Sequence, residues 1–269
     1  MENISVLMSL YEKESADYFD LAIKSLYNQV YPAKEIILVL DGPITASLQN
    51  IIDKWINILP IKVIPLKENQ GLARALNAGL KHCQYDYIAR MDTDDICTPN
   101  RFQAQIDFLE KNNDVDVVGT WITEIDENNQ EIRPCVKFPL LHSELFSFFS
   151  KRDPLAHPTV MFRKRFFTKS GEYPTIIPMG EDTALWFYGF KNNCKFANIP
   201  SIGVKFRRTS DFYFRRANKE KTMKLLKYRV FKINKELGYG MSSNIYAFLY
   251  ALLALSPTFV KKIMYRYLR

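Results

Sequence analysis

The sequence predicts an α/β protein in which helices cover a mostly parallel central sheet, and two observations support this fold class. Short apolar runs that are typical of buried strands recur along the first half of the chain. Between them lie segments whose apolar residues have helical spacing. This strand–helix alternation is typical of a parallel sheet, because each crossover helix packs on a face of the sheet.

The elements follow one another closely along the chain. We expect strands, each from a short apolar or aromatic run, at 4–10, 35–40, 61–66, 85–91 and 115–122. We expect helices at 17–29, 48–58, 69–80 and 101–111. After a hairpin-like turn at 126–129 the alternation breaks, and the second half predicts a helix at 138–150, a strand entered through 153–162 and a helix that begins at 181. The 269 residues suffice for one large domain or for a domain with an appendage.

The net charge of +8 is unevenly distributed. From Lys205 onward, sixteen Lys and Arg residues face three acidic residues, which leaves the tail at +13 and the rest at −5. Such asymmetry predicts an anionic partner for the tail, either a membrane surface, a phosphate group or nucleic acid. The absence of a recognised nucleic-acid reader motif argues against nucleic acid.

Several function classes lose support from the sequence. Neither G-x-G-x-x-G nor G-x-x-x-x-G-K-[ST] occurs, which argues against a dinucleotide oxidoreductase and a P-loop phosphotransferase. The cysteines have no paired spacing that would indicate zinc or a disulfide framework, so we expect reduced thiols in the cytosol; they are Cys83, Cys97, Cys135 and Cys194. No basic region followed by an apolar run marks a signal peptide at the N-terminus.

Polar residues follow four of the predicted strands where each strand ends. Because the carboxyl ends of parallel strands meet at one edge of a sheet, we expect these residues to converge there. They are Ser9 with Tyr11, Asp41, Asn69 with Arg74, and Asp92 with Asp94. Taken singly, each could instead be a turn or helix-cap residue.

The acidic turn, defined here as Asp92–Asp95, carries three carboxylates within four positions. Like charges this close repel one another, and a divalent cation among them would relieve the repulsion. Carboxylate oxygens suit Mn²⁺ or Mg²⁺, which often complete their shells with substrate phosphates. The alternative is a solvated loop in which Asp95 or Thr98 caps the next helix.

Four stretches together resemble family 2 glycosyltransferases with the GT-A fold, and in particular bacterial enzymes that build surface polysaccharide. The stretches are Ser5–Tyr11, Ser25–Gln29 with Glu35–Gly42, Asn69–Asn77 and Asp92–Asp95. The resemblance covers about the first 210 residues. One departure is Leu40-Asp41, where the family often has two aspartates before the glycine.

The resemblance implies a role for each residue at the strand ends. Ser9 and Tyr11 would line the uridine pocket, and Asp41 would bond the base or the ribose. Arg74 would lie near the nucleotide or the diphosphate. Asp92 would contact the ribose or the donor sugar, while Asp94 would hold a Mn²⁺ or Mg²⁺ ion on the diphosphate.

A second acidic motif, Glu181-Asp182, opens the helix predicted from 181. Inverting glycosyl transfer needs a base that takes the proton of the acceptor hydroxyl. The resemblance implies Asp182 as this base, with Glu181 orienting it or binding the acceptor; the alternative is two acids that complement the helix dipole. His157 is an acceptor-side candidate or a structural histidine, and Trp186 is a sugar-stacking platform or a core residue.

A basic loop near residues 203–216 would, by the resemblance, fold over the donor diphosphate. Its candidate arginines are Arg207, Arg208, Arg215 and Arg216, and Arg207 is the one that we assign to the nucleotide-sugar site. The other possibility for each is a solvated surface arginine.

We expect a catalytic domain at 1–210, with a nucleotide-sugar half at 1–123 and an acceptor half at 124–210. Residues 211–269 would form a basic, amphipathic helical tail, whose apolar run 245–255 has only eleven residues and is too short to cross a bilayer. Its mixture of aromatic and basic residues suits an anchor on an anionic membrane. A helix packed on the catalytic domain, or a homodimer contact, is the alternative.

The sequence therefore predicts a metal-dependent, inverting transferase on the cytoplasmic face of the membrane. It would move a galactose- or glucose-type hexose from a UDP-sugar to a polyprenyl-diphosphate-linked glycan. Two rivals remain: a sugar-nucleotide pyrophosphorylase, which lacks support because no glycine-rich, Arg/Lys-bearing N-terminal loop occurs, and a non-catalytic, membrane-associated sugar-binding protein of the same fold.

Overall fold

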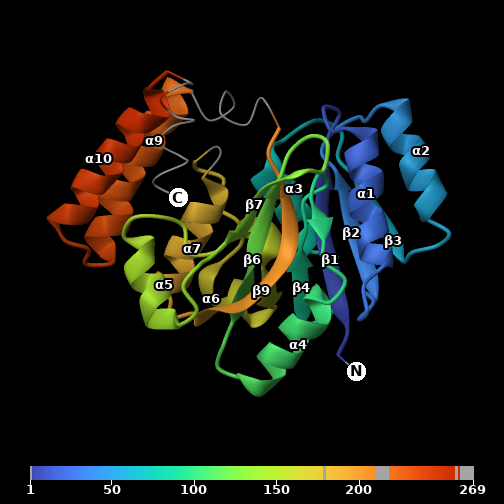
Figure 1. The fold of residues 1–269 in the computed structure, drawn as a ribbon, viewed down its shortest axis with the longest axis horizontal. Helices are drawn as coiled ribbons and strands as arrows, with labels where there is room; N and C mark the ends of the chain where they lie inside the picture. The colour runs from blue at the N-terminus through green and yellow to red at the C-terminus, as the bar shows by residue number, and fades with distance from the viewer. Residues whose placement is uncertain (1, 178–179, 210–217, 258–259, 261–269) are drawn as a thin grey trace.

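The computed structural model of the chain describes residues 2–177, 180–209, 218–257 and 260. Its centre is a nine-stranded sheet with the order β3-β2-β1-β4-β8-β6-β9-β5, and β7 pairs with β6 off this path. Helices cover both faces of the sheet (Figure 1). The predictions for Arg215, Arg216 and residues 261–269 lie outside the described residues.

The first half of the chain forms a parallel block. Its strands are β1 (Ile4–Leu10), β2 (Glu35–Leu40), β3 (Ile61–Pro65) and β4 (Tyr87–Arg90). β1 pairs in parallel with β2 and β4, and β2 pairs in parallel with β3. All six residues of β2 are buried, as is typical of a parallel strand covered on both faces. These four strand predictions are confirmed to within a few residues at their ends.

The second half of the chain turns the sheet into a mixed one. β8 (Met161–Arg163) lies antiparallel between β4 and β6 (Val117–Ile125). β6 runs parallel to β9 (Phe196–Arg207) and forms an antiparallel hairpin with β7 (Glu131–Val136). The α/β prediction is confirmed, but parallel pairing is limited to the first block and to β6 with β9. The strand predicted to be entered through 153–162 is present as β8, but its antiparallel pairing was not predicted.

The helices divide between the two faces because residues of a strand point alternately to opposite sides. In β1, Val6 and Met8 join the core cluster that includes α1 (Ala16–Tyr27), α2 (Ala46–Trp55) and α4 (Arg101–Lys111), while Leu7 joins the other cluster. That second cluster includes residues of α3 (Leu72–Leu80), α5 (His142–Phe149), α6 (Arg165–Ser170) and α7 (Glu181–Lys191). The predicted helices at 17–29, 48–58, 69–80, 101–111, 138–150 and from 181 are therefore present, with shifted ends.

β9 changes the interpretation of the predicted basic loop. Gly203 to Arg207 are part of this twelve-residue strand rather than of a loop. β9 also pairs antiparallel with β5 (Ile96–Cys97), a two-residue strand directly after the acidic turn. The strand therefore brings residues about 110 positions further along the chain to the edge of the acidic turn.

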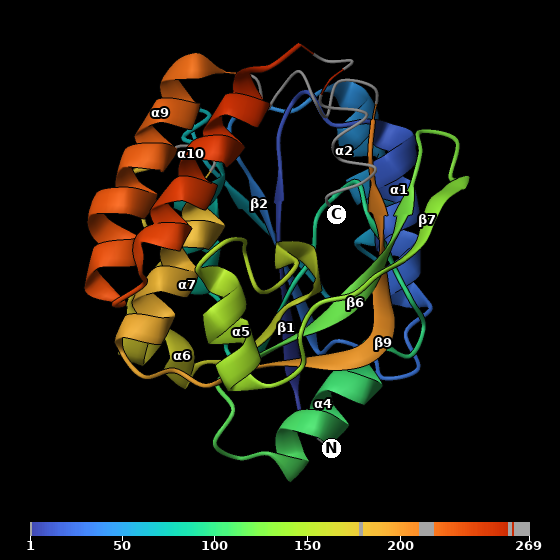
Figure 2. The same cartoon turned by 60° about the vertical axis from the view of Figure 1, so that its left-hand side comes forward.

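The C-terminal helices pack against the rest of the fold. α9 (Lys219–Tyr228) continues as the π-helical segment η2 (Arg229–Asn234), and α10 (Met241–Leu255) lies beside them (Figures 1 and 2). Ile233 is fully buried in the core cluster that contains α7. Within the described residues, no helix combines the length and the apolar character that a membrane span needs.

Candidate active site

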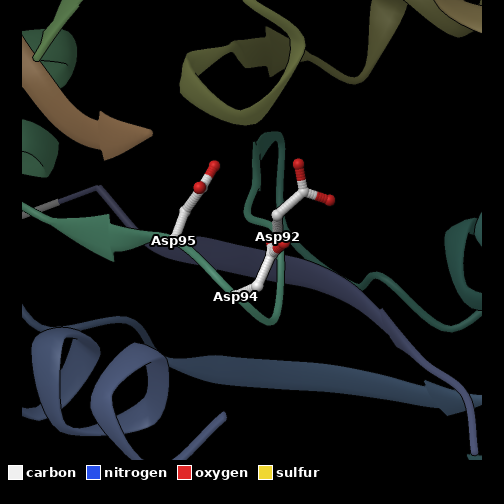
Figure 3. A group of neighbouring side chains, drawn as sticks. All are labelled: Asp92, Asp94 and Asp95. Atoms are coloured by element: carbon white, nitrogen blue, oxygen red, sulfur yellow. The ribbon is translucent and has the colours of Figure 1, made fainter. Parts of the chain in front are cut away.

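The acidic turn connects β4 to β5 at the carboxyl edge of the parallel block. Figure 3 shows Asp92, Asp94 and Asp95 leaving this one turn. One carboxylate oxygen from each lies within 4.8 Å of the others. The turn is fixed to the end of β1, because Thr93 Oγ1 donates a hydrogen bond of 3.4 Å to the carbonyl of Ser9. The predicted cluster of three carboxylates is therefore present in space as well as in sequence.

Asp95 differs from its two neighbours because its side chain is fully buried. Its Oδ1 accepts a 2.7 Å hydrogen bond from the backbone N–H of Arg207. Its Oδ2 is buried and has no hydrogen-bond partner among the described residues. Burial above all, and then the charges of Asp94 and Asp92, raise the pKa of Asp95 well above its usual range.

Neither predicted cap of the following helix is found in the structure. Asn100 precedes α4, and its side chain makes no capping hydrogen bond. Thr98 Oγ1 instead donates to the carbonyls of Ile202 and Gly203 on β9, at 3.0 and 3.2 Å. Asp95 lies before β5 and not at the helix. The alternative in which Asp95 or Thr98 caps the helix was wrong, because β5 separates the turn from α4.

The acidic turn fits a hard divalent cation. Its donor atoms are all carboxylate oxygens, which Mg²⁺ and Mn²⁺ prefer. The buried Oδ2 of Asp95 is the kind of orphaned acceptor that a cation would satisfy. A cation would also offset the repulsion among the three carboxylates.

Arg207 holds the acidic turn rather than facing an open diphosphate site. Its guanidinium lies over the ring of Tyr18, 4.0 Å from the centroid. The same group donates to the carbonyl oxygens of Asp94 (2.8 Å) and Asp126 (2.9 Å) and to Oδ1 of Asn129 (2.7 Å). Since Arg207 is also buried, its predicted contact with the nucleotide is not what this geometry favours. Arg208 is likewise engaged, in a 2.6 Å ion pair with Glu124.

Asp41 supports the start of α3 from the end of β2. Its Oδ1 accepts from the N–H of Gln70 at 2.7 Å, and its Oδ2 accepts from the N–H of Gly71 at 3.0 Å. Gly71 has φ +87°, a left-handed conformation that favours glycine. Asp41 is thus a residue that supports a turn at a helix start, which was the alternative given for it. The exposed Arg74 lies on the first turn of the helix that follows, α3. Ser9 and Tyr11 are half-buried at the end of β1, on the same edge of the sheet.

Arg90, the last residue of β4, connects the acidic turn to the second half of the chain. Its buried guanidinium forms an ion pair with Asp92 through Nη2. The pKa of Glu181 is raised chiefly by burial, while Arg90 opposes this rise and Asp92 adds to it. Burial likewise raises the pKa of Tyr173, to which Asp182, Glu181 and Asp92 contribute. The two acidic motifs therefore lie within electrostatic range of each other around Arg90.

Glu181 and Asp182 occupy the first turn of α7, after Gly180 as the N-cap residue. Asp182 Oδ1 accepts a 2.7 Å hydrogen bond from the N–H of Thr183. Both acids therefore lie where the dipole of α7 stabilises negative charge, as the alternative interpretation predicted. This position is also compatible with a catalytic role. Thr183 Oγ1 in turn bonds the carboxylate of Asp153 at 2.9 Å.

Two acceptor-side candidates are core residues. Trp186 is fully buried against Phe162 and Phe196, so it offers no exposed face for a sugar. His157 is buried, and its Nε2 shares a 3.0 Å hydrogen bond with the hydroxyl of Tyr173. Burial, and then Arg90, lower the pKa of His157 well below its usual range, so the imidazole is neutral. The sugar platform predicted for Trp186 was wrong, because α7 turns this side chain into the core.

Sequence reasoning missed three residues that build this site. Asn77 on α3 makes a two-way bridge to the backbone of Tyr173, at 2.9 and 2.8 Å, and so fixes the Tyr173 loop. Arg90 carried a usable signal, because it is a charged residue at the end of an otherwise apolar strand. Tyr173 carried no such signal, since nothing in its sequence neighbourhood distinguishes it.

The comparisons with known proteins agree with this geometry. The family model described as "Glycosyl transferase family 2" matches residues 5–171. "Amylovoran biosynthesis glycosyltransferase AmsE" of Erwinia amylovora is 35% identical over 266 residues, which cover 97% of each chain. "UDP-Gal:alpha-D-GlcNAc-diphosphoundecaprenol beta-1,3-galactosyltransferase" of Escherichia coli is 33% identical over 241 residues, covering 90% of this chain and 84% of the relative.

Solved structures share the fold. The crystal structure of S. aureus TarS 1-349 superposes with a TM-score of 0.63 at 18% identity, covering 94% of this chain and 80% of that one. The same protein in complex with UDP-GlcNAc gives a TM-score of 0.63, again at 18% identity, with coverage of 96% and 82%. Because the family model spans more than half of the sequence, the chain belongs to glycosyl transferase family 2 and is a glycosyltransferase.

Proposed function

We propose that this glycosyltransferase is metal-dependent and inverting, and that it moves a hexose from a UDP-sugar to a hydroxyl of a lipid-linked glycan. One observation carries the proposal. The buried Arg90 pairs with Asp92 of the acidic turn, which fits a divalent cation, and its charge also acts on Glu181 of the pair Glu181-Asp182, which fits acceptor activation. A donor and an acceptor bound at these two motifs would meet between them.

The donor assignment draws on the comparisons. A fold neighbour has been solved with UDP-GlcNAc, and one relative is named for UDP-Gal as its donor. These names support a UDP-hexose, with galactose or glucose as the class that we favour. On the protein side, Ser9 and Tyr11 would face the uridine, and Asp41 would act through the start of α3 that it holds. Exposed Arg74 is the cation that we assign to the nucleotide.

The acidic turn would place the donor diphosphate. We assign Asp94 as the metal ligand and Asp92 as a contact to the ribose or the donor sugar. A bound Mn²⁺ or Mg²⁺ would neutralise the charge that develops on the departing nucleoside diphosphate. Arg207 supports this arrangement from behind, because it bonds the carbonyl of Asp94 and the carboxylate of Asp95.

Asp182 would accept the proton of the acceptor hydroxyl as that oxygen attacks the anomeric carbon. The new bond forms on the face opposite to the departing UDP, so the anomeric configuration inverts. Glu181 would orient Asp182 or bond the acceptor. The buried His157 has a neutral imidazole, which shares a hydrogen bond with the hydroxyl of Tyr173 and so would hold that hydroxyl in place.

A membrane surface fits the outer face of α10. The strongly exposed apolar residues of this helix follow helical spacing along one side, and they are Met241, Ile245, Phe248, Leu249 and Leu252. The neighbouring helix α9 carries lysines at 219, 221, 224 and 227. An apolar face flanked by cations is typical of helices that lie in the interface of an anionic bilayer. A lipid-linked acceptor on the cytoplasmic face of the membrane would require such a position.

Vesicle binding tests the membrane assignment. The protein should sediment with vesicles that contain phosphatidylserine and much less with phosphatidylcholine vesicles. Replacing Phe248 and Leu249 with Ser should abolish this binding, whereas Ile132→Ser, an equally exposed apolar residue on β7, should not. Sedimentation that does not depend on the α10 substitutions would refute the assignment, and a concentration-dependent dimer lost in the same variant would identify a subunit contact instead.

A transfer screen tests the activity itself. UDP-galactose, UDP-glucose and their N-acetylated forms would be offered with Mn²⁺ and a GlcNAc-diphosphate-lipid acceptor. One donor should give a glycosylated product with inverted anomeric configuration. A product of retained configuration, or a requirement for a nucleoside triphosphate with release of pyrophosphate, would overturn the proposal.

A further inference from the structure

Two arginines of the core, Arg90 and Arg101, are equally buried but differently bonded. Each is only 2% exposed. Arg101 has acceptors around its whole guanidinium; they are Gln105 Oε1, the carbonyls of Arg90 and Val160, and the sulfur atoms of Met91 and Cys97. Arg101 is thus a structural residue whose donors are all used.

Arg90 leaves two donors unused. Its Nη2 pairs with Asp92, but Nε and Nη1 are buried without a hydrogen-bond partner in the part of the chain that the structure describes. Removing charged N–H groups from water without replacing their hydrogen bonds is unfavourable, and buried polar groups are almost always bonded. The two donors therefore point to a partner outside the part of the chain that the structure describes.

The position of Arg90 limits what this partner is. The charge of Arg90 acts on Glu181 at the start of α7 and on Tyr173, while its Nη2 holds Asp92 of the acidic turn. Under the proposed function, on which this inference rests, UDP lies at the acidic turn and the acceptor lies at α7. The group between them is the hexosyl ring that is transferred.

We propose that Nε and Nη1 of Arg90 bind hydroxyl oxygens of the transferred hexose, which makes Arg90 a sugar-recognition residue. The planar guanidinium fixes the directions of Nε and Nη1, which donate from different edges of the group, so each would bind a separate hydroxyl oxygen. The same guanidinium fixes Asp92, so one side chain positions an acidic donor contact and reads the sugar. The diphosphate does not need Arg90, since a cation at Asp94 offsets its charge.

The test compares two affinities in each protein. Calorimetry with Mn²⁺ would give the Kd of UDP and the Kd of the UDP-hexose that the wild-type enzyme transfers. Their ratio isolates the contribution of the sugar. Arg90→Lys keeps a positive charge for Asp92 but loses the paired donors, so the Kd for the UDP-hexose should rise about 10-fold or more while the Kd for UDP stays within about 2-fold. Arg101→Lys, the matched control, should lower the melting temperature without changing the ratio.

Each other outcome overturns the inference. Equal weakening of UDP and UDP-hexose would assign Arg90 to the diphosphate or to the turn itself. An unchanged ratio would mean that water satisfies the two donors. If the wild-type protein binds UDP-hexoses and transfers none, the proposed function fails separately from this inference.

A second measurement covers the case in which Arg90→Lys does not fold. Donors that lack single hydroxyl groups, offered to the wild-type enzyme, should include at least one deoxy-hexose with a Kd about 10-fold higher than that of the parent. In a soluble Arg90→Gln variant the same deoxy donor should bind no more weakly than the parent donor. A wild-type protein that binds all deoxy donors as tightly as the parent would refute the assignment.

Discussion

The backbone N–H of Arg207 donates a 2.7 Å hydrogen bond to Oδ1 of Asp95, so the last residue of β9 fixes the acidic turn 112 positions earlier. The guanidinium of Arg207 adds a bond to the carbonyl of Asp94. Through its backbone and its side chain, Arg207 thereby holds the turn from which Asp94, the proposed metal ligand, projects. This relationship makes Arg207 a supporting residue of the site.

Replacing Arg207 with Ala should weaken both the fold and the metal site. The variant loses three side-chain hydrogen bonds and the contact with Tyr18 but keeps the backbone bond to Asp95. We expect the free energy of unfolding to fall by about 3 kcal/mol and Mn²⁺ to bind about 10-fold more weakly. Denaturant unfolding and calorimetry measure the two effects. Lys205→Ala, at a half-exposed residue of β9 that pairs with Glu131, should change neither, and unaltered Mn²⁺ affinity in Arg207→Ala would contradict the supporting role.

Metal removal should abolish transfer and reveal the repulsion in the acidic turn. With EDTA the wild-type melting temperature should fall, because the three carboxylates then lack their counter-charge and the stabilisation by a bound ligand is lost. Asp94→Asn should be inactive, and its melting temperature should not respond to Mn²⁺. Asp107→Asn, an exposed acid on α4, should behave like the wild-type protein. Thermal scans with and without Mn²⁺ check this, and a normal Mn²⁺ response in Asp94→Asn would remove that residue from the metal site.

Asp116 should make stability depend on pH in the acid range. Burial acts to raise the pKa of Asp116, but hydrogen bonds from Arg165, the backbone of Lys195 and Lys169 outweigh it, so the pKa is lowered. The stabilisation is present above the unfolded-state pKa of about 3.9 and is lost as pH falls through the lower folded-state pKa.

The test for Asp116 is the free energy of unfolding between pH 7 and pH 3. Asp116→Asn should cost about 3 kcal/mol at pH 7, because it leaves cationic partners of a buried carboxylate uncompensated, and its acid profile should be flatter. Asp53→Asn, an exposed acid on α2, should keep the wild-type profile. Equal acid sensitivity in wild-type protein and Asp116→Asn would show that other carboxylates dominate.

The C-terminal helices should depend on Arg229. Its guanidinium donates to the carbonyl of Phe149 at 2.8 Å and to Asp153 at 2.9 Å, and Asp153 also holds Thr183 beside Asp182. Arg229→Ala should destabilise the protein by about 3 kcal/mol and lower the rate of transfer, because the start of α7 loses a support. Lys227→Ala, at an exposed residue two positions earlier, serves as the control. An additive double-mutant cycle with Asp153→Ala would show that the pair does not act together.

Much of the fold was accessible from the sequence because three strands of its first half, β1, β2 and β4, are buried on both faces. β1 and β2 lie within the ranges expected from their apolar runs, and the polar residues after them do meet at one edge. β5 was missed because two residues cannot carry a periodic pattern. β9 was missed because its middle contains Pro200 and Gly203, which are typical of loops.

The sequence predicted which residues belong to the candidate site, but not which residues they contact. Asp92 and Asp94 were found because carboxylates in one turn have few structural uses. The true neighbours of Arg207 and Asp95 could not be found, because their hydrogen bond joins residues 112 positions apart. Burial of Trp186 depends on which side of α7 faces the sheet, which the mixed apolar composition of that helix does not reveal.

The central claim is that Asp182 activates the acceptor while the acidic turn binds the donor. Its most direct test is Asp182→Asn, measured for sugar transfer from the selected UDP-hexose and for binding of that donor with Mn²⁺. We predict a loss of about 100- to 10,000-fold in kcat, the factor that a general base typically contributes, together with a donor Kd within about 2-fold of the wild-type value. Transfer at the wild-type rate by a folded Asp182→Asn protein would contradict the account.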